Sequence, residues 1–447
     1  MTLDRDPLLR SSITALVIFD QEPPFAEVVE RFAALCRRTR RFRSRVVAPS
    51  TPWDRPCWEE DRYFDVSTHL RHVRAAHPGD LRAVLDLAQS MAPMAFDPTR
   101  PLWEAIAVDG VIGDKAALII RVHHALIDGV GGLLVAATMM DRDRAGHPLL
   151  AEQDGRSENT TTVQRGGLEC VVRSLVGVPR QAVDAVCRVA ADPADAASRW
   201  LDALIDAGSL IAPSPSPLSP LMRTRTTVRR FDTIVLESDQ VHGAAAAAGL
   251  TLNDLFVAGI LRGLSLYHHR HDIDIEHLRA IMPVSTRRPE DPLESNKFVP
   301  VRIVLPIDLT DARAYLRLVP DLLRRWKQSE ALGTSEMFSF ALDRLPASMT
   351  TRAMAMMLKG VDFVATDVPG PPTDVFFAGA QVEALYAFAP TAGAALNVAL
   401  VTTAGRVNVG LNIDAGAVPD PDIMVACLTD GFDQVLEAAG APKGAIE

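Results

Sequence analysis

A Pro/Ser-rich stretch, APSPSPLSP at residues 212–220, divides the chain into two parts that carry the same alternation of strand-like and helix-like segments. Alternating Pro and Ser favour a stiff, extended linker, so we expect the chain to cross there from one half to the other. Hydrophobic periodicity predicts the main segments of both parts. The first part has strands at 11–20, 102–108 and 115–124 and a helix at 24–42, and the second has strands at 231–239, 396–405 and 406–414 and a helix at 252–270.

The length of 447 residues exceeds what one ordinary hydrophobic core accommodates, which agrees with two halves. We predict an α/β (α+β) protein in which each half combines a mixed sheet with helices. The first half spans residues 1–150, a helical and Pro/Ser-rich crossover spans 151–225, and the second half spans 226–447. Two comparable halves leave a groove between them, where ligands often bind.

Composition excludes several classes of protein. A formal net charge of −10 argues against non-specific binding to nucleic acid, which needs a basic surface. The five cysteines are scattered without a CxxC pair, as in a reduced protein without a thiolate metal site. We recognise neither a signal peptide nor an apolar run of the ~18 residues that cross a membrane, so we expect a cytoplasmic protein. Its slightly positive mean hydropathy permits contact with lipid.

The stretch RVHHALIDGVGG, residues 121–132, holds the residue types best suited to chemistry. Side chains alternate along a strand, so only one of His123 and His124 can face a groove between the halves. A neutral imidazole there can accept a proton near neutral pH. Asp128 would anchor the following turn, and Gly129 would let the backbone come close to another group. Two histidines tolerated at a strand end before a common Asp-Gly turn would explain the same residues without chemistry.

A second histidine pair, His268 and His269, ends the helix predicted at 252–270 and is flanked by charged residues. We interpret this pair as a solvated helix end. At the start of the same helix, Asn253 and Asp254 are residue types that cap helix N-termini. The segment LMRTRTTVRR offers arginines for phosphate contacts, although charge clusters beside linkers are usually just solvated: Arg223, Arg225, Arg229 and Arg230.

HHxxxDG, at His123, His124, Asp128 and Gly129, resembles the signature of acyltransferases with the chloramphenicol-acetyltransferase-like fold. The other motifs, in their order along the chain, resemble those of one branch, the bacterial wax ester synthase/diacylglycerol acyltransferase (WS/DGAT) family. They are PLW at 101–103, the pair Asn253 and Asp254, MPVSTRR at 282–288, ESNKF at 294–298 and TDVPGPP at 366–372. The resemblance covers roughly residues 45–435.

This resemblance implies two chloramphenicol-acetyltransferase-like subdomains with the active site in the channel between them. It implies transfer of a long-chain acyl group from acyl-CoA to a lipid hydroxyl, giving triacylglycerol from diacylglycerol or wax ester from a fatty alcohol. His124 would face the channel as general base, with His123 turned to the interior and no covalent acyl-enzyme. Asn253 would donate to the negative charge that develops on the thioester oxygen, although helix capping explains it equally well.

The resemblance implies weaker roles in binding substrate or CoA for Trp103, Arg287 and Asn296. A place in the core explains Trp103 better, and a solvated surface charge explains Arg287 about equally well. Acyl-CoA would serve as co-substrate, and we expect neither a metal nor a resident cofactor. Lipid substrates are compatible with peripheral attachment to the inner membrane face or to a lipid-droplet surface.

Three departures from the family pattern concern the acceptor. The N-terminal segment is shorter than the family's and differs from it, Asp367 stands where the late motif normally has Asn, and Pro300 follows Asn296. None of them removes the histidine base. They leave open an acyltransferase acting on a non-lipid hydroxyl or an amine, a condensation-type enzyme, and a degenerate acyl-binding protein.

Overall fold

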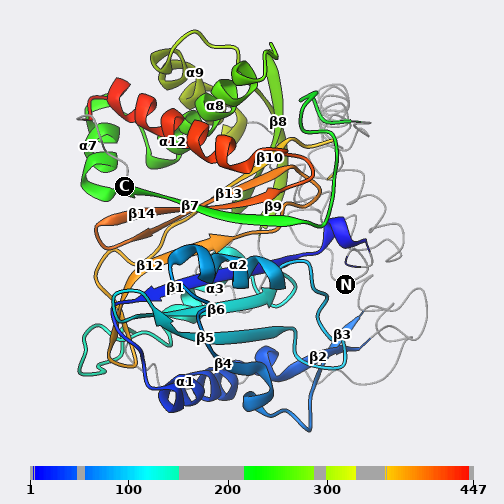
Figure 1. Cartoon of the computed structure of the whole chain (residues 1–447), viewed down its shortest axis with the longest axis vertical. Helices are drawn as coiled ribbons and strands as arrows, with labels where there is room; N and C mark the ends of the chain where they lie inside the picture. The colour runs from blue at the N-terminus through cyan, green and yellow to red at the C-terminus, as the bar shows by residue number, and fades with distance from the viewer. Residues whose placement is uncertain are drawn as a thin grey trace, which may run out of the picture.

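The computed structural model shows two six-stranded sheets, one above the other in Figure 1, with helices packed around them. It describes residues 4–47 except Arg5, 56–150, 216–285, 298–328, and 358–441 except Lys359. The mixed α/β class with two sheet-containing halves is therefore confirmed. Most of the crossover expected at 151–225 lies outside the described residues, as do Arg287 and Asn296.

The N-terminal sheet has the strand order β11-β12-β1-β6-β5-β4. It is apolar on both faces because helices cover both faces. Val17 and Phe19 of β1 pack with α1, whereas Leu16 and Ile18, one residue out of phase, pack with α2. The elements are β1 (Ser12–Phe19), α1 (Phe25–Arg38), β4 (Leu70–Arg74), α2 (Leu81–Met91), β5 (Trp103–Val111), β6 (Lys115–His123), α3 (Gly129–Ala137), β11 (Phe376–Phe377) and β12 (Ala380–Phe388).

A separate two-stranded sheet and three short 3₁₀ helices complete this half. They are β2 (Ser44–Val47) with β3 (Cys57–Glu60), η2 (Pro7–Leu9), η3 (Arg40–Arg43) and η4 (Val66–His69).

The C-terminal sheet has the order β7-β14-β13-β10-β8-β9. Helices α8 and α12 cross over it at glycines, since a Cβ on Gly431 would lie 2.3 Å from the backbone nitrogen of Gly263. The elements are β7 (Arg229–Glu237), α7 (Ser238–Ala248), α8 (Leu252–Arg270), β8 (His277–Ser285), β9 (Phe298–Pro306), α9 (Ala312–Gln328), β10 (Phe363–Val368), β13 (Leu396–Thr403), β14 (Arg406–Asp414) and α12 (Pro421–Ala438).

Two strands from the C-terminal part of the chain belong to the N-terminal sheet. β12 pairs antiparallel with β1, with Thr14 opposite Phe388, and β11 pairs with β12. A boundary at residue 226 therefore separates the sequence into halves but does not separate the two sheets. Figure 1 shows β12 lying between β1 below and the strands of the upper sheet.

The two sheets meet along a closely packed seam. The rings of Phe231 on β7 and Phe388 on β12 stack with centroids 4.1 Å apart. A Cβ on Gly410 of β14 would lie 2.3 Å from the carbonyl oxygen of Ala387, so only glycine allows this approach of the two backbones. Helix α2 also reaches the seam, where the Gln89 side chain accepts a hydrogen bond from the Phe231 N–H at 2.9 Å.

The expectation of a solvated histidine pair at the end of α8 is wrong for one of the two residues. His268 is only 1% exposed and shares a hydrogen bond of 2.8 Å with the Ser219 hydroxyl, while its other ring nitrogen lies 2.7 Å from the Leu264 carbonyl. His269 is exposed. The end of α8 thus packs on the last residues of the Pro/Ser-rich stretch.

Within the described ranges, no single helix is long and apolar enough to cross a membrane. Only α7 and α8 taken together reach that length and apolarity, and they are bent by 99° relative to each other.

Candidate active site

The HHxxxDG segment forms a tight turn between β6 and α3. β6 ends at His123, whose carbonyl accepts a hydrogen bond of 2.9 Å from the Leu126 N–H. Asp128 is the N-cap of α3, with its Oδ1 accepting from the Gly131 N–H at 2.6 Å. This carboxylate satisfies an amide that the first helical turn leaves without a partner. The structure thus gives Asp128 the anchoring position expected from sequence.

His123 is buried and hydrogen-bonded through both ring nitrogens. Its Nδ1 lies 2.9 Å from the Ala125 amide, and its Nε2 lies 3.0 Å from Oδ2 of Asp4. The ring of Phe96 meets it edge-on, with centroids 6.1 Å apart. His123 is therefore buried in the N-terminal half, where it also forms part of the wall of a cavity.

His124 has a different environment. The side chain is partly exposed, and the backbone N–H donates to the Ser11 carbonyl at 2.7 Å. Burial lowers the pKa of His124 below its ordinary value of 6.5, although the Asp128 charge acts in the opposite direction. The lowered pKa keeps the imidazole neutral near neutral pH.

Two cavities lie next to this segment. The first lies between the halves and is lined by residues of β1, β7, β12 and β14. The second has Asp4, Phe96 and His123 in its wall. Arg10 and Ser12 line both, so the two cavities adjoin. Neither of these two cavities has His124 in its described lining, and its orientation toward a channel stays a prediction.

The late TDVPG segment meets the start of α3 from the other half. A Cβ on Gly129 would lie 3.2 Å from Cγ2 of Val368, the last residue of β10. Only glycine fits at position 370, because the backbone of Thr402 passes so close that a Cβ would lie 1.8 Å from its carbonyl oxygen. Two motifs separated by more than two hundred residues thus come together at the seam. Asp367, the residue that departs from the family pattern, is exposed.

The start of α8 differs from the expectation in one respect. Thr251 is the N-cap, and its side chain and that of Asp254 form a reciprocal capping box. Asp254 therefore has the expected capping role. Asn253 lies in the first turn between them and is not the cap, so capping does not explain this residue. Its role as a donor in catalysis stays a prediction.

Trp103 is a core residue, as expected. It is 1% exposed, its indole N–H donates to the Phe42 carbonyl at 2.7 Å, and its ring stacks on those of Phe32 and His69. The PLW element therefore contributes Trp103, the first residue of β5, to the core of the N-terminal half.

The arginines after the linker mostly make internal contacts, contrary to a role in binding phosphate. Arg225 donates to the carbonyls of Gly393 and Val361, and Arg229 pairs with the buried Asp414 at 3.4 Å. Burial lowers the pKa of both guanidinium groups. Arg230 bonds Asp422, while Arg223 is exposed.

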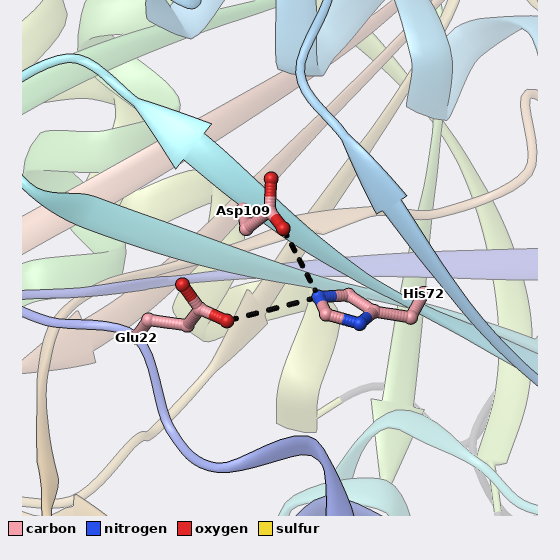
Figure 2. Close-up of side chains that lie close together, drawn as sticks. All are labelled: Glu22, His72 and Asp109. Atoms are coloured by element: carbon pink, nitrogen blue, oxygen red, sulfur yellow. Dashed lines mark ion pairs between the residues drawn. The ribbon is translucent and has the colours of Figure 1, made fainter.

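One cluster in the described part of the chain has the composition of a metal site. Figure 2 shows His72 Nε2 directed at the carboxylates of Asp109 and Glu22, at 3.3 and 3.8 Å. Glu22 follows β1 at the end opposite to the HHxxxDG segment. The guanidinium group of Arg74 also pairs with Asp109, with Nη1 3.6 Å from Oδ1. The cluster is thus a surface ion-pair group remote from the histidine motif.

Sequence reasoning missed two residues that contact the motif directly, Asp4 and Ser11. Both come from the N-terminal segment, and no periodicity or spacing in the sequence connects them to residues 123 and 124. The structure brings them to the motif because β1, which follows them, pairs with β6 so that Ser12 lies opposite His123.

Comparison with known proteins agrees with the motifs. A family model described as the wax ester synthase/diacylglycerol acyltransferase catalytic domain matches residues 12–256, and the WS/DGAT C-terminal domain matches residues 294–435. The chain is 30% identical over 445 residues to a Mycobacterium tuberculosis protein provisionally named a diacylglycerol O-acyltransferase, covering 98% of this chain and 90% of the relative. It is 24% identical over 369 residues to an O-acyltransferase of Acinetobacter baylyi, covering 81% and 79%.

Solved structures show the same fold. The wax ester synthase/diacylglycerol acyltransferase from Marinobacter aquaeolei VT8 superposes with a TM-score of 0.64 at 21% identity, covering 97% of this chain and 96% of that one. The first condensation domain of the calcium-dependent antibiotic synthetase gives a TM-score of 0.61 at 16% identity, covering 99% and 95%. These likenesses identify the chloramphenicol-acetyltransferase-like fold.

Proposed function

Because the chain belongs to the WS/DGAT family and is an acyltransferase of that type, we propose that it transfers a long-chain acyl group directly from acyl-CoA to a lipid hydroxyl. The acceptor is diacylglycerol, a fatty alcohol or both. His124 is the general base. The observation that supports this assignment is a partly exposed histidine with a lowered pKa, in a segment whose Gly129 lies against Val368 of the other half.

The reaction needs a general base because a hydroxyl group is a weak nucleophile. An alcohol attacks a thioester carbonyl slowly until a positioned base takes up its proton. A neutral His124 accepts that proton as the new C–O bond forms and the C–S bond to CoA breaks, and then returns it to the CoA thiolate. His123 is unsuited to this task, because its Nδ1 accepts the Ala125 amide and its Nε2 bonds Asp4.

The transfer proceeds without a covalent acyl-enzyme in this proposal. A thiol nucleophile has to ionise, and burial raises the pKa of Cys36 to about 12 and also raises the pKa of Cys427. These two buried thiols therefore remain protonated. Direct attack by the acceptor needs a base and a donor to the thioester oxygen, and Asn253, in the first turn of α8, is our proposed donor.

The proposed acceptors dissolve in bilayers and oil phases, so we propose that the enzyme meets them at a membrane or lipid-droplet surface. The slightly positive mean hydropathy of the chain supports this contact. Sedimentation with vesicles that contain diacylglycerol tests it, with vesicles that lack diacylglycerol as the comparison.

An acceptor panel tests the reaction class. Free CoA released from palmitoyl-CoA is measured with hexadecanol, with diacylglycerol and without acceptor, and the lipid products are identified by mass spectrometry. Release that depends on either lipid, with formation of the matching ester, supports the proposal. Release only with a non-lipid hydroxyl or an amine would assign another acceptor, and binding of acyl-CoA without turnover would identify an acyl-binding protein.

A further inference from the structure

Asp4 joins the N-terminal segment to the first histidine of the motif. Its Oδ2 accepts from His123 Nε2 at 3.0 Å, and its Oδ1 accepts from the Ser11 N–H at 3.0 Å. Burial opposes ionisation of Asp4, but its hydrogen bonds with His123 and with the Ser11 amide outweigh burial and lower its pKa. The group at this position is therefore a carboxylate, and each of its two oxygens holds a different partner.

Through these partners Asp4 acts on both peptide groups that flank the His124 side chain. Ser11, held by Oδ1 of Asp4, uses its carbonyl to accept the N–H of His124 at 2.7 Å. His123, held by Oδ2, uses Nδ1 to accept the N–H of Ala125 at 2.9 Å. The direction in which the His124 Cβ leaves the backbone depends on the orientation of these two amides.

The hydrogen bonds also assign the tautomer of His123. A backbone amide can only donate, so Nδ1 carries the lone pair and the proton of the neutral ring lies on Nε2, from which it points to Asp4. The other tautomer would set N–H against N–H at Ala125. Asp4 thus selects the one ring form that can hold the Ala125 amide, in the way that a carboxylate orients an imidazole in other sites.

We propose that Asp4 is a positioning residue for acyl transfer: it holds His123 and Ser11, and through them it sets the backbone on which His124 presents its imidazole to the acceptor hydroxyl. The proposal rests on the assignment of His124 as general base. A displacement of about 1 Å of a reacting group costs up to about 100-fold in rate, so a contact that does not itself touch the substrate can matter.

The chain offers a matched control in the same segment. Asp6 also accepts an amide, the Leu8 N–H at 3.0 Å at the start of η2, and it is exposed. Asp6→Ala therefore disturbs the local turn without removing a bond to Ser11 or to His123. Asp4→Ala removes both bonds. Asp4→Asn keeps one oxygen acceptor, so it can hold one of the two partners.

The kinetic test compares the three variants with the wild type, using palmitoyl-CoA and the preferred acceptor. Titration with acyl-CoA counts the binding-competent sites, and kcat is expressed per competent site. We expect kcat to fall about 10- to 100-fold in Asp4→Ala and less in Asp4→Asn, with the KM for acyl-CoA and the activity of Asp6→Ala nearly unchanged. Unchanged kcat per competent site in Asp4→Ala would overturn the proposal, whether or not the variant is less stable.

A spectroscopic readout makes the contact testable apart from activity. The ring ¹⁵N shifts of selectively labelled histidines, assigned with His123→Asn, report the tautomer at neutral pH. We expect the wild type and Asp6→Ala to hold His123 as the Nε2–H form, and Asp4→Ala to show a mixture. A mixture of tautomers in the wild type would contradict the hydrogen bond between Asp4 and His123, and with it the proposal. Absence of acyl transfer by a wild type with the expected tautomer would refute the proposed function instead.

Discussion

At the scale of single residues, the two adjacent histidines differ in what surrounds them. His123 has both ring nitrogens bonded, and His124 is partly exposed with a lowered pKa. Alternation along the strand predicted that only one of them would face the groove. It did not predict Asp4, because that contact joins residues 119 positions apart.

The pH dependence of the reaction follows from the lowered pKa of His124. Since burial lowers this pKa below 6.5, the base stays neutral as the pH falls through 6.5. Activity is therefore full at neutral pH and is lost only as the pH falls through the lowered pKa. We predict that the acidic limb of a kcat/KM profile has its midpoint below 6.5. A midpoint at or above 6.5 would contradict this environment for the base.

Asp128→Ala tests the N-cap of α3. The variant loses the acceptor of the Gly131 N–H, so the free energy of unfolding falls by about 1 kcal/mol, as measured by urea denaturation. Asp80→Ala is the matched control, because Asp80 caps α2 through the Ala83 N–H at 2.9 Å. We expect similar losses of stability and a loss of kcat only in Asp128→Ala. Equal kcat values in both variants would mean that the turn does not position the base.

At the scale of elements, the sequence predicted those segments whose signals are local. The helix expected at 252–270 is α8, because its apolar residues pack on the C-terminal core and Thr251 and Asp254 cap it. The interpretation of its C-terminal end was wrong for His268. Its partner, Ser219, lies in the tail of the linker, and burial by a remote segment leaves no local pattern.

The crossing of α8 and α12 gives a prediction about packing. A Cβ on Gly263 would lie 2.6 Å from Cα of Leu428, so Gly263→Ala forces the helices apart and lowers the free energy of unfolding by about 1 to 3 kcal/mol. A Cβ added to Gly243, in α7, would meet no atom of the described residues within 4 Å, so Gly243→Ala should raise that free energy by about 0.5 to 1 kcal/mol. Urea denaturation compares the two. An unchanged free energy of unfolding in Gly263→Ala would refute the close crossing of the two helices.

At the scale of the whole molecule, the two halves share a sheet. The sequence predicted two comparable α/β halves with a groove between them, and the resemblance implied the fold. Neither predicted that β12 would pair with β1, because Thr14 and Phe388 lie far apart in sequence and strand pairing over such distances has no periodic signal. The same holds for the contact of Gly129 with Val368 at the seam.

The shared sheet predicts that the first half does not fold alone. A fragment of residues 1–225 lacks β11 and β12, which leaves β1 as an exposed apolar edge. We expect this fragment to show no cooperative thermal transition by circular dichroism and to aggregate on size-exclusion chromatography. Co-expression with residues 226–447 should restore a soluble complex. A monomeric fragment that unfolds cooperatively would contradict an obligatory role for the two strands.

The central claim is that His124 accepts the proton of the acceptor hydroxyl. The most direct measurement is acceptor-dependent CoA release by His124→Ala beside His147→Ala, since His147 is an exposed histidine that pairs with Asp143 at 2.8 Å. We predict that kcat falls about 100- to 10,000-fold in His124→Ala, with acyl-CoA binding retained, and stays near the wild-type value in His147→Ala. Near wild-type turnover by His124→Ala would contradict the account.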